Sequence, residues 1–314
     1  MEAGGVGFRS LVIGGGLIFL ICWAAGANPA PFDKVQVFCW DLTPTTTRVL
    51  QGLAEGLGQV LPVVSADGSS ETGQRQVRRL RREKLRLLVV LGTPALILAA
   101  PVIKETPVVF AQVSDPYQTG AAYHPDQPED HQANITGLAS PPPLAEAIRE
   151  FRRLFPTKSH WGLIYDPADG SSQELRQRLT LELAMAGQTL TVVAWHPSAT
   201  AAGAVQELLA QGVEVAYLPP DGAASRYATA LFAAGQAGKL VVINGNPGLR
   251  EPGAILQVSL DYVALGRETA ALVRRILAGE KPKNIPIATV KPLELTVAED
   301  LLVRWLGYPP GRGQ

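Results

Sequence analysis

Cysteine, histidine and net charge are scarce in this 314-residue chain, and each scarcity excludes a kind of site. Its 28 basic side chains balance 28 acidic ones, so no overall field attracts nucleic acid and we expect no nucleic-acid partner. Of its two cysteines, Cys39 lies in an apolar run typical of a buried strand. The four histidines have no metal-ligand spacing, which disfavours a metal site; they are His124, His131, His160 and His196.

Catalytic and cofactor-binding motifs are also missing. The sequence has no nucleophile elbow, no Walker A loop and no glycine-rich dinucleotide fingerprint. Gly14, Gly15 and Gly16 follow no strand, because they lie within an apolar N-terminal segment. We therefore expect a protein that is not an enzyme and that holds no cofactor.

Residues 1–27 have the pattern of an export signal. Arg9 precedes an apolar run from Leu11 to Trp23, and Ala25, Gly26 and Ala27 form a small-residue cleavage pattern. We expect export and cleavage after residue 27, so that the mature chain lies outside the cytoplasm. An uncleaved signal anchor, which would tether the chain to the membrane, is the alternative.

From Val35 onward, short apolar strands alternate with amphipathic helices. This pattern predicts an α/β fold with parallel sheets covered by helices on both faces. Segment 115–143 interrupts the alternation and is interpreted as the first crossing between two lobes. The predicted strands are 35–40, 61–64, 87–91, 107–113, 134–138, 161–165, 189–195, 213–218, 240–243, 254–257 and 287–290. The last two predicted helices are 262–278 and 297–306, and residues 41–48 are predicted to form a turn.

One helix, predicted over residues 75–86, carries most of its charge as arginine. Val77, Leu80 and Leu85 lie on its other side, so the simplest interpretation is a solvated helix face over a buried stripe.

Polar side chains follow the strands that end at Leu91 and Val113. Thr93 is predicted to cap a helix with Pro94 at the first helical position, and Asp115 follows the next strand. Since ligands of open parallel sheets bind beyond the carboxyl ends of the strands, these residues become candidates for one small-molecule site. Thr93 would receive an anionic group, and Asp115 would hold an ammonium or hydroxyl group.

The second half of the chain repeats this arrangement. Asp221, Asn244 and Asp261 follow predicted strands, Tyr165 ends one, and these four residues complete the candidate ligand-binding set. The alternative for each aspartate is a turn or helix cap, and for Tyr165 it is packing at the core or rim.

Five segments resemble one family when taken in order. They are LGTPA at 91–95, TPVVFAQVSDP at 106–116, NITGL at 134–138, FPTKSHWGLIYDP at 155–167 and DYVALGRETAALVRRILAGEKPKNIPI at 261–287. Together they resemble the ABC transporter substrate-binding proteins of the family whose better-understood members bind aromatic amino acids. The sequence departs from that pattern at Gly222, where the family commonly has asparagine after the aspartate.

The resemblance implies a type I periplasmic-binding-protein fold of two doubly wound lobes, with three crossings and a ligand between them. It implies a first lobe of 34–138 plus 258–283 and a second of 139–257 plus 284–314. The implied function is an exported or periplasmic solute-binding protein of an ABC importer that captures a small polar ligand, such as an amino acid. Its partners would be a permease and an ATPase on separate chains, and contact with a membrane would come through the permease or an uncleaved N-terminus.

A sensory or adaptor protein of the periplasm is the competing hypothesis. The same two-lobed scaffold could present its surface to a receptor, because fold alone does not decide function.

Overall fold

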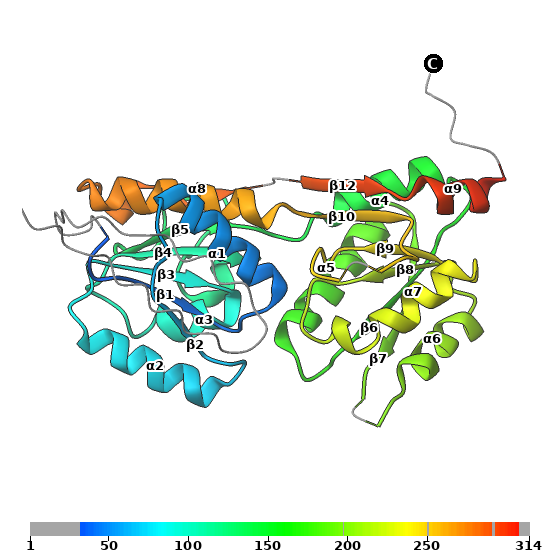
Figure 1. Cartoon of the computed structure of the whole chain (residues 1–314), viewed down its shortest axis with the longest axis horizontal. Coiled ribbons are helices and arrows are strands. Elements are labelled where there is room, and N and C mark those ends of the chain that lie inside the picture. Colours follow the sequence, from blue (N-terminus) through cyan, green and yellow to red (C-terminus); the bar gives the residue numbers. More distant parts are fainter. Residues whose placement is uncertain (1–31, 197, 250, 291–292, 308–314) are drawn as a thin grey trace, which may run out of the picture. The chain divides into compact units, whose positions relative to one another are not determined.

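The computed structural model describes residues 32–196, 198–249, 251–290 and 293–307. Over these residues the chain forms two six-stranded sheets, each with helices on both faces (Figure 1). This confirms the predicted α/β class with two doubly wound lobes. The predicted signal segment, residues 1–27, lies outside the described residues. None of the described helices is long and apolar enough to cross a membrane.

The first lobe is built on an all-parallel sheet. Its strands are β1 (Val35–Cys39), β2 (Val63–Ser65), β3 (Leu87–Leu91), β4 (Val108–Val113), β5 (Ile135–Ala139) and β11 (Ala288–Thr289), and its helices are α1 (Pro44–Leu57), α2 (Ser70–Arg82), α3 (Thr93–Ala99) and α8 (Tyr262–Leu277). The strand order is β11-β5-β4-β3-β1-β2. From β1 to β2 the chain moves toward one edge of the sheet, and from β2 to β3 and β4 it moves toward the opposite edge. Right-handed crossovers in these two directions place α1 on one face of the sheet and α2 and α3 on the other.

Helix α1 begins earlier than predicted. Thr43 caps it by accepting a hydrogen bond from the Thr46 backbone N–H, and Pro44 occupies the first helical position. Much of the turn predicted over residues 41–48 is therefore helix, because the threonine-rich sequence supplies its own cap.

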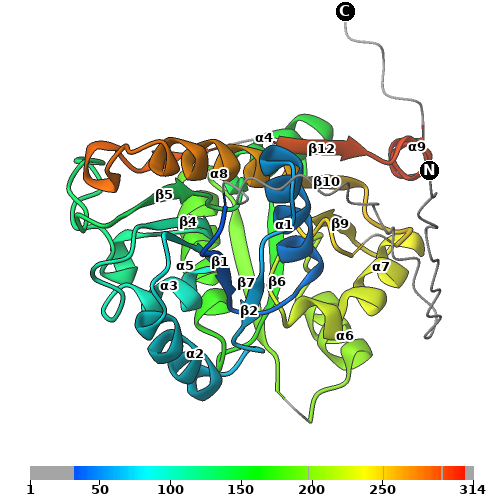
Figure 2. The same cartoon turned by 60° about the vertical axis from the view of Figure 1, so that its left-hand side comes forward.

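Helix α8 packs against α1 (Figure 2), and glycines of both helices lie in the contact. A Cβ atom added to Gly266 would lie 2.2 Å from the Val49 carbonyl oxygen, and one added to Gly52 would lie 1.9 Å from the Val263 carbonyl oxygen. The two backbones therefore approach so closely that no other residue fits at these positions without movement.

The second lobe has one antiparallel strand at the edge of an otherwise parallel sheet. Its strands are β6 (His160–Tyr165), β7 (Thr189–Ala194), β8 (Val215–Leu218), β9 (Val241–Asn244), β10 (Leu256–Leu260) and β12 (Leu293–Val297), and its helices are α4 (Leu144–Leu154), α5 (Gly170–Met185), α6 (Ala201–Ala210), α7 (Ala228–Gln236) and α9 (Glu299–Leu306). The strand order is β12-β10-β9-β8-β6-β7. Strand β12 is not among the strands predicted from the sequence, and the helix predicted over 297–306 begins at its last residue.

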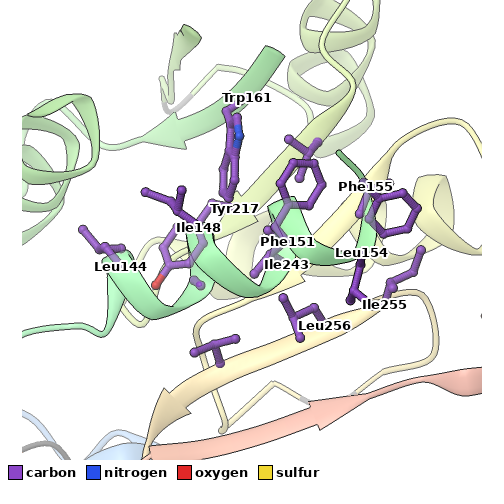
Figure 3. Packing of buried hydrophobic residues seen from close by; sticks show 14 of the residues in the cluster. Leu144, Ile148, Phe151, Leu154, Phe155, Trp161, Tyr217, Ile243, Ile255 and Leu256 are labelled. Carbon is purple, nitrogen blue, oxygen red and sulfur yellow. The ribbon is translucent and has the colours of Figure 1, made fainter. Parts of the chain in front are cut away.

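Aromatic side chains build the core under α4 (Figure 3). Phe151 contacts Trp161 edge to face at 4.8 Å between ring centroids, and it stacks on Phe155 at 5.6 Å. Phe151 and Trp161 are fully buried. This core holds α4 and α5 against the sheet whose strand ends carry the second half of the candidate site.

The chain passes between the two sheets three times: after β5, after β10, and between β11 and β12. Segment 115–143 contributes only its last residues to the first crossing. Its middle folds back on the first lobe, where Ala122 and His131 form an isolated bridge and the His131 side chain hydrogen-bonds the Ile285 carbonyl oxygen.

Sheet pairing differs from two of the predicted lobe limits. Val258 lies within β10, which pairs with β9 and β12 in the second sheet, whereas β11 pairs with β5 in the first. The assignment of the remaining connecting residues to either lobe stays a prediction.

Candidate functional site

Thr93 ties two strand ends of the first lobe together. Gly92, with φ of 98°, turns the chain after β3 and is itself the residue that precedes α3. Thr93 is therefore the first helical residue rather than the predicted cap, because the left-handed turn that glycine permits is completed one residue earlier. Its hydroxyl oxygen accepts a long hydrogen bond, 3.4 Å, from the Ser114 backbone N–H beyond β4.

Asp115 stabilises its own turn. Its Oδ1 accepts from the Tyr117 backbone N–H at 2.9 Å, and its Oδ2 accepts from the Gln118 side-chain amide at 3.0 Å. This is the alternative that the sequence left open for each aspartate. A carboxylate has further lone pairs, so these two bonds leave capacity for a ligand donor.

Gln112 is an unexpected feature of the same edge. Its φ of 58° is left-handed, and the pairing of β4 with β5 shifts register between Phe110 and Val113. Its side-chain amide accepts from the Thr46 hydroxyl at 3.1 Å and donates to the Thr45 hydroxyl at 3.0 Å. This contact fixes the start of α1 against the end of β4. The sequence does not predict this bulge, because a glutamine within an apolar strand is also compatible with regular pairing.

Tyr165 ends β6 in the second lobe and is partly exposed. The Arg176 guanidinium, from α5, lies 5.3 Å from its ring centroid. The guanidinium covers one face of the ring in a cation–π contact, which is more favourable when it is partly shielded from water.

Asp221 is a largely buried carboxyl group after β8. Its Oδ1 accepts from the Ala224 backbone N–H at 2.9 Å. Its Oδ2 is shielded from solvent, and no described donor reaches it with hydrogen-bond geometry, although the Ser172 hydroxyl lies close enough to favour the carboxylate. Burial raises the pKa of Asp221 to about 6, against the smaller opposing effects of Ser172 and Ala224.

Asn244 and Asp261 support the ends of β9 and β10. Asn244 is 2% exposed, and its amide donates to the Leu249 carbonyl oxygen and accepts from the Asn246 backbone N–H. Asp261 caps α8 by accepting from the backbone N–H groups of Val263 and Ala264, which is the alternative that the sequence left open for each aspartate. Both side chains are therefore engaged in holding loops.

A direct side-chain contact joins the two lobes. The Ser114 hydroxyl donates to Glu174 Oε2 of α5 at 3.1 Å, and the other oxygen of Glu174 lies 3.6 Å from the Arg178 guanidinium. The Glu174 side chain is 16% exposed. Sequence reasoning missed Glu174, because a glutamate in an amphipathic helix is usually solvated. Among the described hydrogen bonds and ion pairs, none connects Thr93 or Asp115 to Asp221, Asn244 or Asp261.

One hollow lies away from these residues. It has a volume of about 520 Å³, and α4 and α5 line it with side chains that include Arg149, Arg152 and Met185. None of the six candidate residues borders it, so the strand ends rather than this hollow define the candidate site. Within the described part of the chain, no cluster of histidine, cysteine and acidic residues could hold a metal ion.

Comparison with known proteins places this geometry in a family. A tyrosine-binding protein of Clostridioides difficile is 21% identical over 252 residues, which cover 80% of this chain and 72% of the relative. A conserved domain protein from Vibrio cholerae has a TM-score of 0.74 and 24% identity, over 88% of this chain and 95% of its own. An ABC domain in complex with L-Trp from Streptococcus pneumonia has a TM-score of 0.72 and 22% identity, with the same coverage.

The family model described as ABC transporter substrate binding protein matches residues 49–303, which is most of the chain. The two parallel-sheet lobes match the type I periplasmic-binding-protein architecture. With both the fold and the family model in agreement, the chain belongs to the ABC transporter substrate-binding protein family.

Proposed function

We propose that this chain is an extracytoplasmic solute-binding protein of an ABC importer, which captures an amino acid between its lobes and presents it to a permease. The permease and the ATPase are separate chains, and the protein itself carries out no covalent chemistry. The bound ligand favours the closed arrangement of the lobes, because it contacts both of them at once.

The contact between Ser114 and Glu174 is the observation that carries this proposal. It brings the carboxyl end of β4 to the first turns of α5, so polar groups of both lobes lie within hydrogen-bond distance of each other. A ligand that lies between the strand ends of two such lobes is the arrangement expected for open α/β sheets.

The side chains suit a zwitterion. The Thr93 hydroxyl accepts from the Ser114 backbone N–H and can also donate, so it and the backbone at the start of α3 would receive the ligand carboxylate. The carboxylates of Asp115 and Asp221 would receive its ammonium group. Tyr165 would supply a flat apolar surface for the ligand side chain, and aromatic side chains are common in such pockets. Asn244 and Asp261 would hold the loops of the far wall.

Aromatic amino acids are the first ligands to test. The names of two relatives refer to tyrosine and L-Trp, and this is why we include both in the ligand panel. Gly222 replaces the asparagine that the family commonly has after the second-lobe aspartate, so we expect a ligand that makes fewer side-chain contacts there.

Thermal unfolding of the purified full chain tests the proposal. The panel contains tyrosine, tryptophan, other amino acids, small organic acids and sugars. A ligand present at 100 times its dissociation constant adds about 2.7 kcal/mol to the free energy of unfolding, which shifts the melting temperature measurably. Unchanged melting curves across the whole panel would contradict the proposal.

Two variants then test the contact between the lobes. Ser114→Ala and Glu174→Gln should each weaken binding of the identified ligand by roughly 10- to 100-fold, since hydrogen bonds to charged groups contribute about 1.5–3 kcal/mol. Glu182→Gln, a change of the same type further along α5, is the matched control and should leave affinity unchanged. Equal affinity in all four proteins would exclude Ser114 and Glu174 from the site.

Gene neighbourhood separates import from sensing. Adjacent genes for a permease and an ATPase would support import, whereas an adjacent receptor kinase gene would support the sensory alternative.

A further inference from the structure

A local excess of positive charge lies on α2 and on the residues that follow it. Between Ser69 and Arg86 the sequence carries seven basic and two acidic side chains, although the whole chain has equal numbers of each. The α2 basic surface consists of the exposed side chains of Arg75, Arg78, Arg79, Arg81 and Arg82 on α2 and of Lys84 just after it.

Only part of this charge is neutralised locally. Arg75 pairs with Glu71, and Arg79 pairs with Glu83, each at 2.9 Å. Both pairs are exposed and therefore hold their partners weakly. Among the described residues, Arg81 and Arg82 have no ion pair. The surface thus presents an excess of positive charge that a solvated helix does not need for folding.

An apolar groove lies beside the basic surface, between α2 and α3. Its volume is about 240 Å³, and its lining includes Arg78, Ile97, Leu98 and Pro101. Ile97 is 47% exposed. A surface that binds a bilayer needs cations for the anionic headgroups and apolar side chains for the boundary between headgroups and acyl chains. The arginines and the aliphatic lining of this groove supply both.

The side-chain types favour a lipid surface over other polyanions. Every basic residue of α2 itself is arginine, whose planar guanidinium binds phosphate oxygens in pairs. Neither α2 nor α3 contains an aromatic residue. Single-stranded nucleic acid is bound largely by stacking on aromatic rings, and protein interfaces are enriched in them.

The position of the surface leaves the candidate ligand site open. Arg81 and Arg82 precede β3, so they lie toward the amino edge of the first sheet, whereas Thr93 and Asp115 follow strands at its carboxyl edge. Helices α2 and α3 also cover the face of the sheet opposite α1. We propose that the α2 basic surface and its groove dock the first lobe onto an anionic phospholipid membrane while the ligand site stays accessible.

Vesicle binding by the full chain tests this docking. The measured quantity is the ratio of partition coefficients onto phosphatidylcholine vesicles with and without phosphatidylglycerol, at low salt. Residues 1–33 carry one basic and two acidic side chains, so they have no excess of positive charge that would favour the anionic vesicles. Their own membrane affinity therefore contributes about equally to both partition coefficients and largely cancels in the ratio. We expect a ratio far above one that falls as salt is added, because exposed charges are screened.

The triple variant R78Q/R81Q/R82Q should lower the ratio roughly 100-fold, since each cation near an anionic bilayer contributes a factor of about five. The matched control, R149Q/R152Q/R153Q, removes the same charge from α4 and should change the ratio less than about threefold. Ile97→Ser, which keeps the charge, should lower partitioning onto the anionic vesicles severalfold. Unchanged melting temperatures verify that all variants fold.

Several results would overturn the proposal. A wild-type ratio near one, or an equal loss in the α4 control, would show that α2 is not a specific lipid surface. If a single-stranded oligonucleotide binds as tightly as the anionic vesicles, and the α2 substitutions abolish that binding, the surface is a general polyanion site. Arginine-dependent capture of a partner protein without any vesicle binding would indicate a protein interface instead.

Discussion

Replacing Asp221 by asparagine should stabilise the protein near neutral pH. The wild-type carboxyl group must ionise in a largely buried position, where no donor among the described residues reaches one of its oxygens with hydrogen-bond geometry. Asparagine keeps an oxygen that can accept from the Ala224 backbone N–H, and it removes the charge. The gain comes from the desolvation cost that the carboxylate no longer incurs.

The magnitude follows from the pKa. The pKa of Asp221 is raised from 3.8 to about 6, and each unit corresponds to about 1.4 kcal/mol, so ionisation of the buried carboxyl costs about 3 kcal/mol. Below a pH of about 4 the group is neutral in both states and the substitution should have little effect. Between pH 4 and pH 6 the folded protein holds a proton on Asp221 that the unfolded chain has released. The free energy of unfolding of the wild type therefore falls, relative to that of the variant, as the pH rises from about 4 to about 6. Above about pH 6 the difference between the two proteins stays constant.

Urea unfolding at several pH values, followed by tryptophan fluorescence, measures this difference. Trp161 and Trp195, both buried in the second lobe, report its unfolding. The exposed Asp41→Asn variant is the control and should differ from wild type by less than about 0.5 kcal/mol at every pH. A destabilised Asp221→Asn protein at pH 8, or a difference that does not change with pH, would refute the reasoning. If Asp221 also holds a ligand ammonium, the same variant should be more stable but bind ligand more weakly.

Two further substitutions test packing in the two lobes. Gly266→Ala should destabilise the first lobe by about 1–3 kcal/mol, because the new Cβ would lie 2.2 Å from the Val49 carbonyl oxygen. Denaturant unfolding measures this loss. The control Gly170→Ala, whose new Cβ would have open space, should show no comparable loss. Phe151→Ala should cost the second lobe about 3–5 kcal/mol by leaving a cavity against Trp161, and Phe151→Leu should recover much of that loss when unfolding is measured by calorimetry.

The periodicity of the sequence was enough to predict most elements, because each strand is an apolar run bounded by polar turns. Strand β3, with all five residues buried, is the plainest example. The order of strands and helices then implied two parallel sheets, since right-handed crossovers leave few alternatives. The polar residues at strand ends followed from the same pattern, but the cap that Asp261 provides for α8 is the alternative to the ligand-binding role predicted for it.

Tertiary structure decided what those polar residues contact. Composition and spacing do not reveal the left-handed Gln112, because the bulge arises from the pairing of β4 with β5 and from the two α1 threonines that hold its amide. Likewise, the sequence places Glu174 on a helix surface, and only the fold brings it to Ser114, sixty residues away in the chain. Local propensity determines where a strand ends, whereas the environment of a side chain beyond it depends on distant segments that no short pattern records.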